Sequence, residues 1–87
     1  MKIIDKPIVR NIINVDKFKK VNCRFIKYRG IKYYYVSDLN NVFDKSQVAC
    51  MAARYVKMNI VHNNSVKNYV MLDARSTKWI CESSKAN

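Results

Sequence analysis

The sequence predicts an α+β fold, with hairpins and helices in the order hairpin–helix–helix–hairpin–helix. Two observations predict it. Apolar and polar residues alternate with period two around an Arg-Gly pair and an Asn-Asn pair, which is typical of β-hairpins. Elsewhere, apolar residues recur at helical spacing behind a Ser or an Asp that can cap a helix. The chain has 87 residues and no internal repeat or linker, so residues 1–87 are expected to form a single domain.

The N-terminal part of the chain has the weakest pattern. Residues 1–6 are expected to form a mobile arm. The stretch "IVRNIINV" after Pro7 is consistent with a short edge strand or with an irregular lead-in. In both interpretations, the clear pattern of regular structure begins at Val21.

The first β-hairpin is predicted around Arg29-Gly30. Alternation begins at Val21, β-branched and aromatic residues follow the turn, and Gly30 supplies the positive φ that a tight turn requires. One face is expected to enter the core through Phe25, Ile31, Tyr33 and Tyr35. Tyr28 and Tyr34 are expected to be exposed. The tip is expected to be cationic, with Lys27, Arg29 and Lys32.

Two helices are predicted after this hairpin. Ser37 is expected to cap a short helix that begins at Asp38, because a carboxylate suits the positive end of a helix dipole. Ser46 is expected to cap a longer helix over Gln47–Lys57, the most regular helical pattern in the chain. An apolar stripe supports this longer helix and comprises Val48, Met51, Ala52, Tyr55 and Val56.

The second hairpin and a final helix complete the predicted fold. Asn63-Asn64 is expected to turn the hairpin, because Asn tolerates the left-handed backbone region better than most residues. Asp73 is expected to cap the final helix. The residues of this helix that are available for packing are Ala74, Thr77, Trp79, Ile80 and Cys81.

The balance of charge indicates an anionic partner. The chain has 17 Lys and Arg residues against 6 Asp and Glu residues, a net charge of +11. Nucleic acid is the commonest partner of such a protein, ahead of an anionic membrane surface, and the alternative is a basic protein that is merely soluble. No apolar run approaches the length of about 18 residues that crosses a bilayer. The N-terminus lacks the pattern of a signal peptide, so an intracellular protein is expected.

The sequence offers little for catalysis or metal binding. A single glycine excludes a glycine-rich phosphate loop. Cys23, Cys50 and Cys81 are widely spaced and odd in number, which is typical of reduced core residues and not of a zinc site. A nucleophile formed by a cysteine and His62 stays open, but no signature surrounds it. We expect a protein that is not an enzyme and that uses no metal or cofactor.

Basic and amide side chains form two candidate surfaces for nucleic acid. Such side chains contact phosphates, and Arg, Asn and Gln also read base edges. The first surface is the solvent side of the predicted long helix, with Lys45, Gln47, Arg54 and Lys57. The second is the hairpin that carries His62, Asn63, Asn64, Lys67 and Asn68.

A helix beside a basic hairpin is the arrangement of winged DNA binders, in which the helix enters the major groove. A winged-helix-like arrangement on double-stranded DNA is therefore expected, with most contacts to phosphates. Arg54, Lys57 and Lys67 are expected to contribute most. The alternative for the helix charges is an ordinary solvated face, and for the Asn-rich hairpin it is ordinary turn chemistry.

Three segments of the chain resemble a family of viral proteins. They are "FIKYRGIKYYYVSDLNNVF", "AARYVKMNIV" and "YVMLDARSTKWICESSKAN". Over about residues 22–87 the chain is similar to Bro-N, the N-terminal domain of baculovirus repeated-ORF proteins, and to the related KilA-N domain. The stretch from Tyr35 to Leu39 matches the family's aromatic strand and helix start, and a later family segment is echoed from Leu72 to Ala86. The chain departs from the pattern where Arg75 or Ser76 replaces a family glycine.

The resemblance implies a DNA-binding module of a virus, without catalytic residues, in the host nucleus or at a cytoplasmic replication site. Two rivals remain beside it. One is a viral protein-interaction module for an acidic host or viral protein, marked by an exposed apolar patch such as Tyr28, Tyr34 and Met58. The other is a single-strand or RNA binder that stacks bases on its tyrosines. The sequence also leaves a homodimer open.

Overall fold

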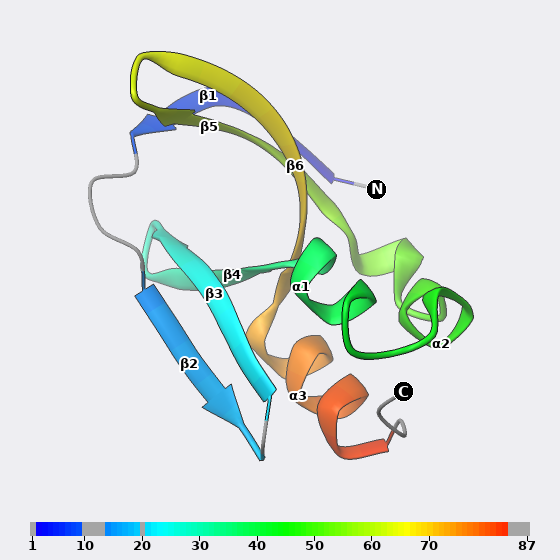
Figure 1. Cartoon of the computed structure of the whole chain (residues 1–87). Coiled ribbons are helices and arrows are strands. Elements are labelled where there is room, and N and C mark those ends of the chain that lie inside the picture. Colours follow the sequence, from blue (N-terminus) through cyan, green and yellow to red (C-terminus); the bar gives the residue numbers. More distant parts are fainter. Residues whose placement is uncertain (1, 10–13, 20, 84–87) are drawn as a thin grey trace.

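The computed structural model describes residues 2–9, 14–19 and 21–83 and confirms an α+β fold (Figure 1). Its strands are β1 (Lys2–Val9), β2 (Asn14–Phe18), β3 (Val21–Tyr28), β4 (Ile31–Tyr35), β5 (Val56–His62) and β6 (Ser65–Asp73). Its helices are α1 (Val36–Asn40), α2 (Lys45–Ala49), the 3₁₀ turn η1 (Ala52–Arg54) and α3 (Ala74–Ser83).

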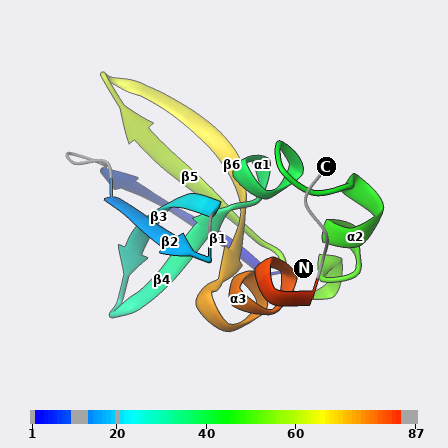
Figure 2. The same ribbon diagram turned by 60° about the horizontal axis from the view of Figure 1, so that its bottom comes forward.

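The described strands form one curved sheet in the order β1-β5-β6-β4-β3-β2. Each neighbouring pair is antiparallel except β1 and β5, which are parallel. The three α-helices gather on one side of this sheet, and the far end of the β5–β6 hairpin extends away from them (Figures 1 and 2). The opposite side of the sheet is concave, and we call it the inner face.

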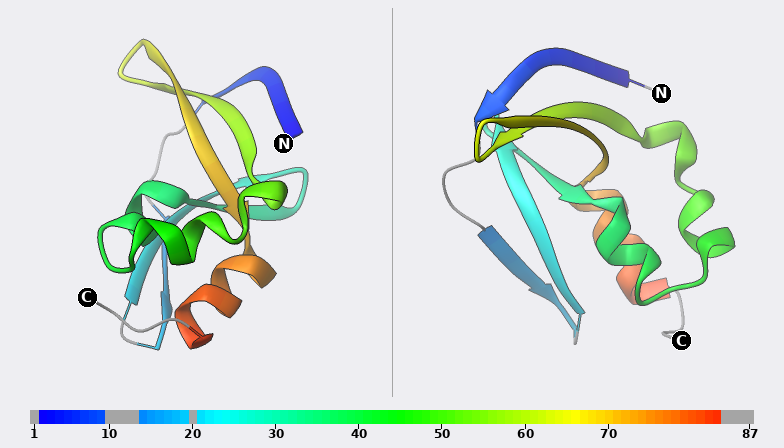
Figure 3. Two further views of the ribbon diagram at one scale, coloured as in Figure 1. Left: turned by 90° about the vertical axis from the view of Figure 1, so that its right-hand side faces the viewer. Right: turned by 45° about the horizontal axis from the view of Figure 1, so that its top comes forward.

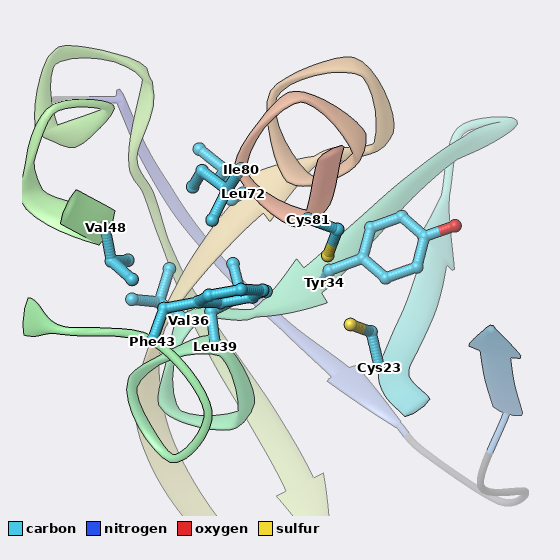
Figure 4. Close-up of a cluster of buried hydrophobic side chains, with 9 residues drawn as sticks. All are labelled: Cys23, Tyr34, Val36, Leu39, Phe43, Val48, Leu72, Ile80 and Cys81. Atoms are coloured by element: carbon cyan, nitrogen blue, oxygen red, sulfur yellow. The ribbon is translucent and has the colours of Figure 1, made fainter. Parts of the chain in front are cut away.

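Each face of the sheet has its own apolar cluster. The cluster under the helices comprises Cys23, Tyr34, Val36, Leu39, Phe43, Val48, Leu72, Ile80 and Cys81 (Figure 4). The cluster on the inner face comprises Ile4, Ile26, Tyr33, Tyr35, Val56, Met58, Ile60 and Met71. Burial on both faces explains why β4 is a run of aromatic residues rather than an apolar–polar alternation.

The predicted first hairpin is confirmed, but the expected exposure of Tyr34 is not. Arg29 and Gly30 have φ values of 51° and 78°, which makes them the two central residues of the turn between β3 and β4. Tyr34 was predicted to be exposed and is only 1% exposed, because the helices cover its side of the sheet. Ile31, predicted to enter the core, is 50% exposed at the end of its strand.

Residues 2–6 are not an arm but the first half of β1. This strand pairs with β5 at both of its ends, and its register shifts between Ile4 and Ile8. Pro7 lies in that irregular stretch, where its missing N–H does not interrupt the pairing. The stretch "IVRNIINV" contributes its first two residues to β1 and its last two to the edge strand β2, and residues 10–13 lie outside the described part.

The two predicted serine caps are wrong. The first helix begins at Val36 and the second at Lys45, and neither N-cap residue makes a side-chain hydrogen bond. Asp38 lies in the first turn as predicted, but its carboxylate accepts hydrogen bonds from Arg24 of β3.

The predicted helix over Gln47–Lys57 is also wrong. Helix α2 ends at Ala49, a 3₁₀ turn follows, and β5 begins at Val56. Strand β5 pairs on both sides, with β1 and with β6, so its backbone gains two rows of hydrogen bonds. Its alternate residues Val56, Met58 and Ile60 also fill the inner face. These long-range contacts outweigh a local helical pattern.

The second hairpin and the last helix are confirmed. Asn63 and Asn64 have φ values of 50° and 62° and form the turn between β5 and β6. The carboxylate of Asp73 accepts a hydrogen bond from the backbone N–H of Ser76 at 2.8 Å, as an N-cap does. Trp79, however, is 48% exposed and does not pack in the core as predicted.

Candidate nucleic-acid interface

A positively charged cleft of about 300 Å³ opens on the inner face between β1 and the β3–β4 turn. We call it the inner-face cleft, and its lining comprises Lys2, Ile3, Ile4, Asp5, Lys6, Tyr28, Arg29, Ile31 and Tyr33. Two strands separate β1 from β4 in the sheet, so the curvature of the sheet brings these walls together (Figure 3). Three cations against one carboxylate attract an anion to this cleft.

The β3–β4 turn places Arg29 at the rim of this cleft. The left-handed backbone at Arg29 suits Asn, Asp or Gly, and an arginine there gains nothing in backbone energy. Its guanidinium carbon lies 5.3 Å from the centre of the Tyr28 ring, so the cation rests on an aromatic face. The turn therefore holds a charged side chain where local backbone preference would place a small one.

A second pocket lies on the inner face near the tip of the β5–β6 hairpin. It has a volume of about 220 Å³ and is lined by Ile60, His62, Asn63, Ser65, Lys67 and Tyr69. We call it the hairpin pocket. It borders the same apolar cluster as the inner-face cleft, since Ile60 and Tyr69 belong to or pack against that cluster. Its polar side chains are of the kinds that contact phosphate.

A further cavity, which we call the Trp79 pocket, lies between η1 and α3. It has a volume of about 220 Å³ and is lined by Met51, Arg54, Arg75, Ser76 and Trp79. Two exposed guanidinium groups and a half-exposed indole share this small space. Trp79 follows Arg75 by four residues, so both side chains project from one side of α3.

Two other cations hold the fold together. Arg24 donates from its backbone N–H and its guanidinium to Asp38, with the shortest contact at 2.8 Å, and the hydrogen bond raises the pKa of Arg24. Lys32 donates to Asp16 at 2.9 Å and lies 4.6 Å from the Phe25 ring centre. Lys32 was predicted as a contact residue, but this pairing engages its charge within the protein.

The structure does not unite the predicted contact residues on one surface. Arg29 lines the inner-face cleft, Asn63 and Lys67 line the hairpin pocket, and Arg54 lines the Trp79 pocket. The others are dispersed: Lys27 on β3, Lys45 and Gln47 on α2, Lys57 on β5 and Asn64 at the hairpin turn.

A winged-helix-like arrangement needs a helix that can enter the major groove, and the predicted candidate is missing. Helix α2 has five residues, and Lys57 lies in a strand. Gln47 is partly buried, and its Oε1 is buried without a described hydrogen-bond partner, so it does not present that oxygen to a base. The predicted helix–hairpin surface is therefore not formed.

Sequence reasoning did not assign the cations Lys2, Lys6 and Arg75, or the indole of Trp79, to a site. The two lysines were assigned to an arm, because a parallel strand pair leaves no local signal in a sequence. Trp79 was counted among the residues of the final helix that are available for packing. The pattern of α3 held a clue, since placing Arg75 on the solvent side places Trp79 there too.

No His, Cys, Asp or Glu residues form a group of three or more within the described part of the chain that could hold a metal ion. The helices described there are too short or too polar to span a bilayer. The free thiols differ in environment: Cys23 and Cys81 are buried, whereas Cys50, predicted to be in the core, is exposed. Comparisons of this chain with protein-family models, with curated proteins and with solved structures found no match.

Proposed function

We propose that this chain is a non-catalytic nucleic-acid-binding protein that holds its ligand mainly through phosphates. The observation that carries the proposal is the inner-face cleft, where Lys2, Lys6 and Arg29 meet on a protein of net charge +11. Lysine and arginine side chains that neutralise phosphates release counterions, which favours binding at low and moderate salt. Tyr28, which is partly exposed, adds a polar hydroxyl group to the lining of the same cleft.

The sequence expectation of double-stranded DNA rests on charge and on the resemblance to Bro-N and KilA-N domains. In this proposal the nucleic acid is bound along its phosphates, because the predicted major-groove helix is not formed: α2 ends at Ala49 and a 3₁₀ turn follows. A viral origin, and a location in the host nucleus or at a cytoplasmic replication site, belong to the same proposal and follow from the resemblance alone.

The test is binding to a labelled random-sequence duplex and to its single strand, titrated across salt. We expect affinity to fall steeply with salt, and the variant Lys2→Gln/Lys6→Gln/Arg29→Asn to flatten that slope. Each lost phosphate contact should remove about 0.9 from the slope for a duplex or about 0.7 for a single strand. Asn suits the left-handed backbone at position 29, so this substitution removes charge without straining the turn.

The matched control removes three cations that line none of the cavities described above: Lys17→Gln/Lys45→Gln/Lys57→Gln. Equal effects of the two triple variants would mean that binding follows net charge, and the cleft would lose its assigned role. Absence of binding at low salt, where even non-specific contacts form, would overturn the proposed function.

A row of valines favours a second candidate function, an interface for another protein. Val9, Val61 and Val66 are direct cross-strand neighbours on β1, β5 and β6, and two of them are more than half exposed. The patch suggested by the sequence does not exist, because Tyr34 and Met58 are buried. Self-association measured by light scattering and abolished by Val66→Lys would support this interface and would include the homodimer that the sequence left open.

A further inference from the structure

The strongest unexplained feature of the surface is the exposed tryptophan of α3. The buried side of this helix carries Ser76, Thr77, Ile80 and Cys81, whereas Arg75, Lys78 and Trp79 are exposed. An indole is a large apolar group, and leaving half of it in water forgoes much of the stabilisation that its burial would bring. The residues around Trp79 indicate which kind of ligand can cover the indole.

The walls of the Trp79 pocket are cationic. Arg75 comes from the same side of α3, Arg54 comes from η1 on the opposite wall, and none of the described residues that line the pocket is acidic. The ion pairs found among the described residues involve Arg24, Lys32 and Lys78, so neither arginine of the pocket is neutralised by a described carboxylate. Two free guanidinium groups beside an aromatic face are suited to a ligand with a flat ring and an adjacent anion.

The volume of the Trp79 pocket limits the size of the ligand that can enter it. The pocket has a volume of about 220 Å³, below the range of about 300–1,000 Å³ of sites that enclose a drug-sized ligand. It has room for one ring system on the indole, with phosphates left at the rim near the guanidinium groups. In a duplex both faces of each base are covered by neighbouring bases, so only an unpaired base can stack on a protein ring.

We propose that the Trp79 pocket receives one unpaired base of a single-stranded nucleic acid, stacked on the indole, while Arg54 and Arg75 contact the flanking phosphates. This inference rests on the proposed function and specifies the form of the strand. It also gives Arg54 a role other than the one predicted from the sequence: it flanks a base pocket and does not read a major groove.

Trp79 is the only tryptophan of the chain, so its fluorescence reports on this pocket alone. The experiment titrates the 87-residue chain with a 12-nucleotide oligothymidylate, with a blunt duplex and with inorganic polyphosphate, which has the charge but no bases. We expect the single strand to quench Trp79 and to protect it from acrylamide. We expect polyphosphate to bind without either effect, and the duplex to leave the emission unchanged.

Two variants give a second readout. Trp79→Ala should weaken oligothymidylate binding by roughly 5- to 150-fold and leave the affinity for polyphosphate unchanged. Arg54→Gln/Arg75→Gln should lower the salt slope for the single strand by about 1.4, for two phosphate contacts. If Trp79→Ala does not fold, the quenching of the unaltered protein decides by itself.

The outcomes separate this inference from the function on which it rests. Salt-dependent oligonucleotide binding without quenching would leave the proposed function standing and overturn the base pocket. Equal quenching by polyphosphate would overturn it too, since the site would then recognise only anions. Lack of binding to either nucleic acid would overturn both, and an acidic protein would then be the better candidate for covering Trp79.

Discussion

Replacing Tyr34 by Phe tests how the sheet is held together on its helix side. The Tyr34 hydroxyl donates to Asp16, whose carboxylate also accepts a hydrogen bond from Lys32 at 2.9 Å. The variant keeps the ring and its contacts with Phe18 and Phe25, at centroid distances of 5.3 and 5.4 Å. Only the hydroxyl is lost, and Asp16 retains Lys32 and water.

The magnitude follows from the type of bond and its exposure. A hydrogen bond to a charged group contributes about 1.5–3 kcal/mol. The Asp16 side chain is 33% exposed, so water screens and partly replaces this bond. We therefore expect Tyr34→Phe to lower the free energy of unfolding by about 1–2 kcal/mol.

Urea unfolding followed by circular dichroism measures this loss. The midpoint should fall by about 1 M without a change in the slope of the transition. A double-mutant cycle with Asp16→Asn isolates the pair, and the coupling energy should account for most of the loss. A Tyr34→Phe protein as stable as the unaltered one, or a coupling energy near zero, would refute the pairing of this tyrosine with Asp16.

Two further predictions concern pH and thiol chemistry. Hydrogen bonds from Tyr34 and from a lysine lower the pKa of Asp16 below its ordinary 3.8, so the stability it contributes is present above that value and is lost as the pH falls through the folded-state pKa. In the Asp16→Asn variant, the free energy of unfolding should therefore decrease less as the pH is lowered from 5. An unchanged dependence on pH would contradict this prediction. Cys50 is exposed and should react with a thiol reagent in the native protein. Cys23 and Cys81 should react only in denaturant, because both thiols are buried (Figure 4). In addition, a hydrogen bond with Cys81 and burial raise the pKa of Cys23, which lowers its thiolate fraction. Rapid reaction of more than one thiol per native chain would count against this core.

The elements that could be predicted are those whose signals lie close together in the chain. Both hairpin turns are examples, because a two-residue turn with positive φ needs residues such as Asn63, Asn64 and Gly30. The cap formed by Asp73 is another, since it depends on a residue three positions away. The α+β class follows from these local features together.

The candidate sites were harder to predict, because they join segments that are distant in the chain. The inner-face cleft needs β1 to pair with β5, more than fifty residues later, and then needs the sheet to curve. Whether a face of the sheet is buried also depends on distant segments. Tyr34 was expected to be exposed, but both faces of β4 are covered. The sequence shows how many cations the chain has. It does not show which of them the fold pairs with Asp16 or Asp38.

The sequence by itself determined the charge, the hairpin turns, the cap of the last helix and the fold class, because composition and short-range backbone preference act before any tertiary contact forms. Tertiary structure alone decided that Val56 and Lys57 belong to a strand and not to a helix, that Trp79 faces solvent and that the predicted contact residues are spread over separate cavities. The physical reason is cooperative pairing. A strand bonded on both sides and packed on one face gains more free energy than a short helix gains from local spacing.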